Sequence, residues 1–295
     1  MSIVTILLPD FSLILFGALL IRITDWGREF WVGLEKLIYF VLFPALLFYS
    51  TSRAPLDFGA TGRVLQIALA ATVAGVLLGW LAKPLFRAGP MIFESGVQTA
   101  FRFNSYIALA AASRLDASQA ATMALIIGFA VPLTNMASVH ALVKQNGGLL
   151  RELLKNPLLL ATLAGVSFNL LGLHLPEVAG VMLSRLGNAS LALGLIAVGA
   201  GLRLNGLHAS KGIAAYFMFI KLAAVPAVAY GLGRWLDLPH AQLQLVVLFA
   251  ALPTASSAYV LAVRMGGNGP LVAFLISAGT VISMLTLPLW LALVG

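Results

Sequence analysis

The sequence predicts an all-α membrane protein with ten transmembrane helices in a 5+5 inverted repeat, in which the fourth and ninth helices are interrupted. Composition sets the class, because hydrophobic residues make up 61% and charged residues only 9% of the 295 residues. The mean hydropathy of +1.00 lies far above that of a soluble domain of this length. Ten apolar runs near the length of a membrane span, and a proline within the ninth, provide the other two observations.

Charged or glycine- and proline-rich segments separate the ten apolar runs. The spans are expected at Ile3–Ile23, Trp31–Thr51, Gly62–Ala82, Met91–Ser113, Ser118–Val143, Pro157–Leu173, Val181–Leu202, Lys211–Trp235, Ala241–Val263 and Pro270–Val294. The longest polar interval, residues 144–156, forms a linker between a first repeat of residues 1–143 and a second repeat of residues 157–295. Each half holds an odd number of spans, so the two halves must lie in opposite orientations in the membrane.

Weak internal matches agree with such a repeat. The third span of the first half ends in Gly79-Trp80-Leu81, and the third span of the second half ends in Gly233-Arg234-Trp235-Leu236. Pro132 and Pro288 occupy comparable places in the fifth spans. These matches support an inverted repeat of the kind that is common in secondary transporters.

Lysine and arginine are unevenly distributed between alternate loops. One side carries Arg22, Arg28, Lys36, Lys83, Arg87, Lys144, Arg151, Lys155, Arg203, Lys211 and Arg264, and the other carries Arg53, Arg63, Arg114, Arg185 and Arg234. The positive-inside rule places residues 144–156 in the cytoplasm and both termini on the non-cytoplasmic side. The formal net charge of +8 is therefore assigned to membrane topology, and nucleic acid is not expected as a partner.

Two spans are predicted to be broken near their middle. Pro253 interrupts the ninth span, where it removes a backbone donor and clashes with the preceding turn. The fourth span has no proline, but Gln98, Thr99, Arg102, Asn104 and Ser105 gather halfway along it. If the two spans cross there, the N-termini of their half-helices converge near the bilayer centre, where their free amides favour an anion.

The chain resembles the auxin efflux carrier family, which includes the plant PIN proteins and bacterial members labelled as malonate or organic-anion permeases. The resemblance covers essentially the whole chain. The motifs that carry it are FVLFPALLF at residues 40–48, FRFNSYIALA at residues 101–110, ALPTASSAYVLAVRMGGN at residues 251–268 and SAGTVISMLTLPLWL at residues 277–291.

The resemblance implies a ten-helix fold like that of bile-acid sodium symporters and sodium/proton antiporters. The first, second, sixth and seventh helices would form a scaffold that commonly dimerises, and the other six a transport domain whose fourth and ninth helices cross. The family's asparagine in the fourth helix falls on Asn104, and its ninth-helix proline falls on Pro253. The implied location is the bacterial inner (cytoplasmic) membrane, with a small organic anion and membrane lipid as partners.

Candidate site residues follow from the same region. The substrate-binding set is Asn104, Arg102, Ser105, Pro253, Thr254, Ser256, Ser257 and Pro44, and the coupling or structural charges are Lys221 and Glu94. Arg102 could hold a carboxylate in a bidentate contact, or reach an interface or pair with Glu94. Lys221 could take the place of a coupling cation, or tie down a carbonyl of a broken helix. Pro44 could face the substrate or only kink its helix.

Other functions fit the sequence less well. A sodium/proton antiporter needs carboxylates near the crossover, and only Glu94 is expected near membrane depth in the transport domain. A sodium-coupled symporter of the bile-acid type remains the alternative, since amide, hydroxyl and carbonyl oxygens can bind sodium. No Gly-x-Ser-x-Gly, His-Glu-x-x-His or nucleotide-binding motif occurs, so no enzyme, metal or cofactor is expected. The prediction is a gradient-driven or facilitative carrier of small carboxylates that works by alternating access.

Overall fold

The computed structural model describes residues 3–53, 58–115, 117–142, 157–202, 211–255, 257–264 and 266–295. All regular structure in these ranges is helical, and no strand occurs among them. Within the described residues, six helices are long and apolar enough to span a membrane: Arg28–Ser52, Thr61–Phe86, Ser118–Leu142, Glu177–Ala200, Lys211–Trp235 and Gly269–Val294. The predicted class, an all-helical membrane protein, is confirmed; the count of ten spans and the inverted repeat stay predictions.

The chain divides into two compact units, which are described separately. Unit 1 comprises Met1–Thr61, Tyr106–Pro132 and Gly147–Gly201, and unit 2 comprises Gly62–Ser105, Leu133–Asn146 and Leu202–Gly295. Unit 1 contains α1 (Ile3–Ile23), α2 (Arg28–Leu37), the π-helical turn η1 (Ile38–Leu42), α3 (Phe43–Ser52), all but the first residue of α7 (Ser105–Leu115), the first part of α8 (Ala117–Leu142), α10 (Pro157–Leu170) and α11 (Glu177–Ala200).

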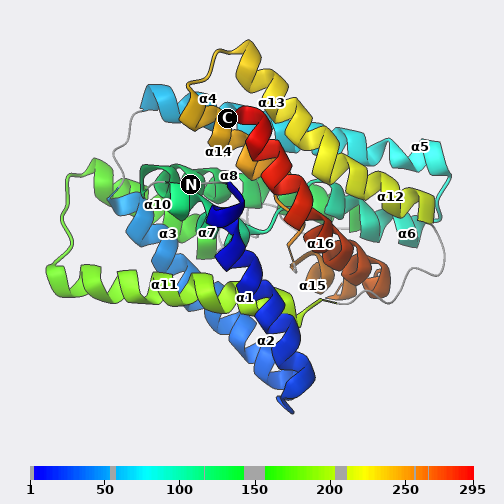
Figure 1. The fold of residues 1–295 in the computed structure, drawn as a ribbon, viewed down its shortest axis with the longest axis horizontal. Coiled ribbons are helices and arrows are strands. Elements are labelled where there is room, and N and C mark those ends of the chain that lie inside the picture. The colour runs from blue at the N-terminus through cyan, green and yellow to red at the C-terminus, as the bar shows by residue number, and fades with distance from the viewer. Residues whose placement is uncertain are drawn as a thin grey trace. The chain divides into compact units, whose positions relative to one another are not determined.

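Unit 2 contains the other described helices and the two non-helical segments, residues 101–104 and 252–255, that interrupt the predicted fourth and ninth spans. Its elements are most of α4 (Phe58–Trp80), α5 (Ala82–Phe86), α6 (Pro90–Gly96), the 3₁₀ turn η2 (Val97–Ala100), the end of α8, α12 (Lys211–Phe219), the π-helical turn η3 (Ile220–Ala224), α13 (Val225–Trp235), α14 (His240–Ala251), α15 (Ser257–Arg264) and α16 (Gly269–Val294). The segments α12, η3 and α13 follow one another as a continuous rod (Figure 1).

Glycines allow the helices of unit 1 to approach closely. Figure 1 shows α1 crossing α11, and the contact contains Gly17 of α1 and Gly199 of α11. A Cβ atom on Gly17 would overlap the backbone of Ile196, and one on Gly199 would overlap the backbone of Ile14. Small residues are the usual means of close helix packing in membranes, where van der Waals contact drives association.

Two prolines explain the two π-helical turns. Pro44 follows η1 directly after Phe43, and Pro226 follows η3 directly after Val225. In a regular α-helix a proline ring clashes with the carbonyl four residues earlier, and a π turn is one way to make room for it. For Pro226 that carbonyl belongs to Leu222, and it accepts a hydrogen bond from Nε1 of Trp290 on α16 at 2.8 Å. The side chain of Trp290 thus supplies the donor that the proline lacks.

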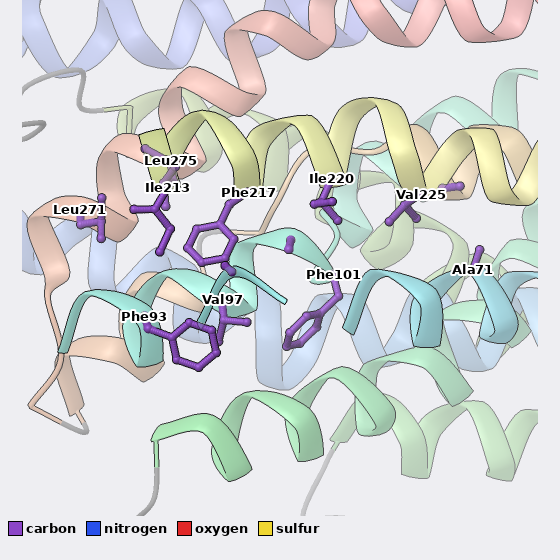
Figure 2. Packing of buried hydrophobic residues seen from close by; sticks show 14 of the residues in the cluster. Ala71, Phe93, Val97, Phe101, Ile213, Phe217, Ile220, Val225, Leu271 and Leu275 are labelled. Atoms are coloured by element: carbon purple, nitrogen blue, oxygen red, sulfur yellow. The ribbon is translucent and has the colours of Figure 1, made fainter. Parts of the chain in front are cut away.

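The core of unit 2 lies between the α12–α13 rod and the segment formed by α6 and η2. Phe217 and Ile220 on the rod pack against the same buried cluster as Phe93, Val97 and Phe101 (Figure 2). Tyr216 Oη also donates a hydrogen bond of 2.9 Å to the carbonyl of Leu78 on α4. The residues that precede the interruption are therefore packed firmly, which fixes where the helix stops.

We predict that Gly199→Ala lowers the thermal stability of the protein. The added Cβ overlaps main-chain atoms of Ile14, so α1 and α11 must separate. Overpacking of this kind costs about 1–3 kcal/mol. Gly33→Ala on α2 is the matched control, since nothing lies within 4 Å of a Cβ at that position. Thermal unfolding in one detergent compares the two variants, and equal midpoints for Gly199→Ala and the wild type would contradict the proposed close contact.

Candidate functional site

The first interruption lies between α6–η2 and α7. The helix tightens into the 3₁₀ turn η2, and the chain is non-helical from Phe101 to Asn104 before α7 begins at Ser105. The amide of Arg102 still bonds to the carbonyl of Gln98 at 2.9 Å. The hydroxyl of Thr99 turns back onto the carbonyl of Gly96 at 2.7 Å. This segment contains neither proline nor glycine, so contacts from elsewhere in the fold must sustain it.

The second interruption lies between α14 and α15. The last helical residue of α14 is Ala251, and Leu252 has extended backbone angles of φ −60° and ψ 142°. Pro253 follows, and the residue before a proline is biased toward the extended conformation. The chain stays non-helical through Ala255, and α15 begins at Ser257. Pro253 therefore ends the helix as the sequence predicts.

The two non-helical segments are joined by a pair of hydrogen bonds that run in opposite directions. The backbone amide of Asn104 donates to the carbonyl of Pro253 at 2.8 Å. The hydroxyl of Thr254 donates to the carbonyl of Thr99 at 2.7 Å. The side chains of Asn104 and Thr254 are only 1% and 3% exposed. Unwinding leaves backbone groups without a helical partner, and each segment supplies a hydrogen-bond partner to the other. We refer to the two segments together as the crossover.

Arg102 lies at the crossover with its side chain 7% exposed. Its Nη2 donates to Oδ1 of Asn135 on α8 at 2.7 Å and to Oγ of Ser257 at 3.3 Å, and its Nη1 donates to Oε1 of Gln98 at 3.4 Å. These three partners are neutral. Ser257 is the first residue of α15 and is exposed, so the arginine reaches from the buried crossover to an accessible helix start.

Lys221 is buried like Arg102 and is 4% exposed; these two are the buried basic residues in the described part of unit 2. It lies in the π-helical turn η3, and its Nζ donates to the carbonyl of Ala250 at 3.1 Å. Ala250 is in the last turn of α14, whose C-terminal carbonyls carry a partial negative charge. This is the contact expected if Lys221 ties down a carbonyl of a broken helix.

The remaining predicted site residues lie in different places. Ser105 is the half-buried first residue of α7, and Glu94 is half-buried on α6. Pro44 belongs to unit 1, where it follows the turn η1, so its predicted role toward the substrate stays a prediction. Ser256 lies outside the described residues. The structure brings together Arg102, Asn104, Pro253, Thr254 and Ser257.

Three further polar groups take part in the site. Asn135 on α8 accepts a hydrogen bond from Arg102 through its Oδ1. Gln98 bonds to Arg102 through Oε1 and to the carbonyl of Ser95 through Nε2, the latter at 3.2 Å. The carbonyl of Thr99 receives the crossover bond from Thr254. The polar cluster in the fourth span was the signal for Gln98 and Thr99, whereas no local pattern marks Asn135.

Two interrupted helices that meet inside a polytopic helical membrane protein are typical of secondary transporters. A profile of the family described as "Membrane transport protein" (Mem_trans) matches residues 98–291, which is more than half of the chain and includes both interruptions. The chain belongs to this family, the auxin efflux carrier family, and is a membrane transporter and not an enzyme. The resemblance found in its motifs is confirmed.

Two curated relatives match the chain over most of its length. A protein of Methanothermobacter thermautotrophicus named "Uncharacterized transporter" is 28% identical over 288 residues, covering 94% of both chains. A protein of Rhizobium meliloti named "Putative malonate transporter" is 26% identical over 280 residues, covering 88% of this chain and 86% of the relative. The substrate malonate is given by the name of the Rhizobium meliloti protein and refers to that protein.

We predict that Thr254→Val destabilises the crossover. Valine keeps the shape of threonine but removes the donor to the carbonyl of Thr99. A buried carbonyl left without that partner costs about 1–3 kcal/mol. Thr280→Val is the matched control, because the buried hydroxyl of Thr280 bonds only one turn back, to the carbonyl of Ile276 within α16. Thermal unfolding should show a larger loss for Thr254→Val, and equal losses would argue against a structural role for the crossover bond.

Proposed function

We propose that this protein is a secondary active or facilitative transporter that moves small organic anions, and specifically carboxylates, across the cytoplasmic membrane by alternating access. Membership of a transporter family sets the class, and the relative named for malonate supports the substrate. The observation that carries the proposal is the guanidinium of Arg102, held at the crossover and bonded to Ser257 at the accessible start of α15. A cation placed beside the N-terminus of a half-helix favours an anionic ligand.

In the proposed site the substrate carboxylate binds beside the crossover. Arg102 supplies the charge, and its planar guanidinium suits a carboxylate better than an ammonium would. Asn104 offers an amide, and Ser105, Thr254, Ser256 and Ser257 line the site with hydroxyls. Pro253 keeps the second segment unwound. A dicarboxylate such as malonate would place its second carboxylate toward the α15 helix start.

The proposed architecture has ten spans in an inverted repeat, with both termini on the non-cytoplasmic side of a bacterial inner membrane. Helices 1, 2, 6 and 7 form the scaffold and the homodimer contact, and helices 3–5 and 8–10 form the transport domain. The separate packing of unit 2, which contains both interruptions, supports this division. The boundary differs in one respect, since α7 and the first part of α8 pack with unit 1.

The proposed coupling does not use sodium. The C-terminal carbonyls of α14 are where a cation would be attracted, and the ammonium of Lys221 already bonds to one of them. In the proposal, the amine of Lys221 therefore takes the place of a coupling cation at the end of α14. The alternative is a sodium-coupled symporter of the bile-acid type, in which sodium binds to carbonyl and hydroxyl oxygens elsewhere at the crossover.

We predict that purified protein in liposomes takes up radiolabelled malonate or another small carboxylate from a panel, and does so equally in sodium and in choline buffers. The hydrogen bond from Lys221 to the carbonyl of Ala250, at the place where a coupling cation would be attracted, is the reason for the second expectation. Isotope uptake is the measurement, because electroneutral exchange gives no current. Uptake that requires sodium would favour the alternative function, and the absence of uptake for every carboxylate in the panel would overturn the proposal.

In the same assay Asn104→Ala should reduce uptake by at least about tenfold, the effect of losing one hydrogen bond of about 1.5 kcal/mol to a charged group. Folding should be retained, since the bond to Pro253 comes from the backbone amide, which alanine keeps. Asn188→Ala makes the same chemical change at an exposed position on α11 and should transport normally. Normal uptake by Asn104→Ala would remove this residue from the site.

A further inference from the structure

Unit 1 contains a cavity with charged residues in its wall. It has a volume of about 870 Å3 and lies among the end of α3, the end of α10, the connection that follows, and the first turns of α11. Arg53, Arg185, His174 and Glu177 line it together with Tyr49 and Leu173. The proposed transport mechanism uses none of these residues.

The cavity carries an excess of positive charge. Its wall holds two arginines and one glutamate. Arg53 is held in place, because its Nη1 donates to Oη of Tyr49 at 2.8 Å and its Cζ lies 5.2 Å from the centre of the Tyr49 ring. Nη1 of Arg53 is also 3.9 Å from the place where a Cβ of Gly180 would lie, so the guanidinium lies beside the first turn of α11. An oriented guanidinium binds phosphate and carboxylate oxygens well.

The cavity lies at helix ends, where the headgroups of a bilayer are expected. The amide of Asn169, near the end of α10, donates to the carbonyl of Thr51, near the end of α3, at 3.0 Å, so the two ends are tied together. The first turn of α11 begins after Pro176 with no side-chain cap, which leaves amide donors for an acceptor in the cavity.

Apolar residues that are open to the surroundings border the same cavity. Leu173 and Val181 line it and are 49% and 46% exposed, and Val178, on the first turn of α11, is 82% exposed. Exposed apolar side chains of this kind suit contact with lipid acyl chains. A ligand in this cavity would therefore combine an anionic group with acyl chains that pass over these residues.

We propose that the cavity is a binding site for an anionic phospholipid, whose phosphate lies between Arg53 and Arg185. The paired arginines supply charge-assisted hydrogen bonds, Glu177 limits the net charge, and the exposed leucine and valine side chains receive the acyl chains. A soluble phosphate monoester shares the headgroup chemistry but lacks the acyl chains, so it is the competing source that the experiment must separate.

The test is native mass spectrometry of the full-length protein with an equal mixture of phosphatidylglycerol and phosphatidylcholine. The wild type should retain phosphatidylglycerol in preference. Arg53→Gln and Arg185→Gln should each lower that preference about fivefold, the effect of one basic residue near an anionic membrane surface. Arg234→Gln changes an exposed arginine at the end of α13 and should leave the preference for phosphatidylglycerol unchanged.

A variant with the opposite expectation separates binding from misfolding. Glu177→Gln removes the negative charge from the cavity wall and should raise retention of phosphatidylglycerol, which a poorly folded protein would not do. An unchanged preference in the Arg53→Gln, Arg185→Gln double variant would overturn the proposal. Displacement of the lipid by glycerol 3-phosphate at equal concentration would also overturn it, since the ligand would then be recognised by its phosphate alone.

Discussion

Backbone polar groups inside a membrane must find hydrogen-bond partners within the protein, and unit 2 depends on how this constraint is met. The chain is not helical at residues 101–104 and again at residues 252–255. The amide of Asn104 and the carbonyl of Pro253 satisfy each other, as do the hydroxyl of Thr254 and the carbonyl of Thr99. Because each unwound segment supplies the partner for the other, both can persist. Their contact holds the starting point of two half-helices in place and gives Arg102 a fixed position beside Ser257.

The same constraint explains two side chains outside the unwound segments. Lys221 donates to the carbonyl of Ala250 where α14 ends, and Trp290 donates to the carbonyl of Leu222 where Pro226 follows. Both carbonyls lie at places where a proline interrupts the helical pattern, and both receive a donor from a neighbouring helix. Near Pro253 and Pro226, backbone carbonyls thus accept hydrogen bonds from the long side chains of Lys221 and Trp290. These polar side chains stabilise the backbone by donating hydrogen bonds to its carbonyls. The proposed contacts with a substrate depend on the backbone that they hold in place.

The sequence predicted the class of protein, its family and the second interruption, because these depend on composition, extended motifs and the local effect of Pro253. The first interruption is harder to predict, since residues 101–104 contain no proline or glycine and are kept unwound by bonds from a segment about 150 residues away. The partners of Arg102 show the same limit: Gln98 is one turn away, but Asn135 and Ser257 are brought to it only by the fold. The sequence predicts that these polar residues lie at a similar depth in the membrane. Which of them bond to one another is seen only in the structure.

The most direct test of the account uses the absence of cysteine from the chain. Ser257→Cys introduces a single thiol at the start of α15, next to Arg102. The measurement is its rate of reaction with a polar maleimide in proteoliposomes, with and without the carboxylate that the protein transports. Ser118→Cys, at an exposed position near the start of α8, is the control. The account predicts that the carboxylate slows the reaction at Ser257→Cys over the concentrations that saturate uptake and leaves the control unchanged. If the carboxylate leaves the rate at Ser257→Cys unchanged while uptake is intact, the substrate binds elsewhere and the account is contradicted.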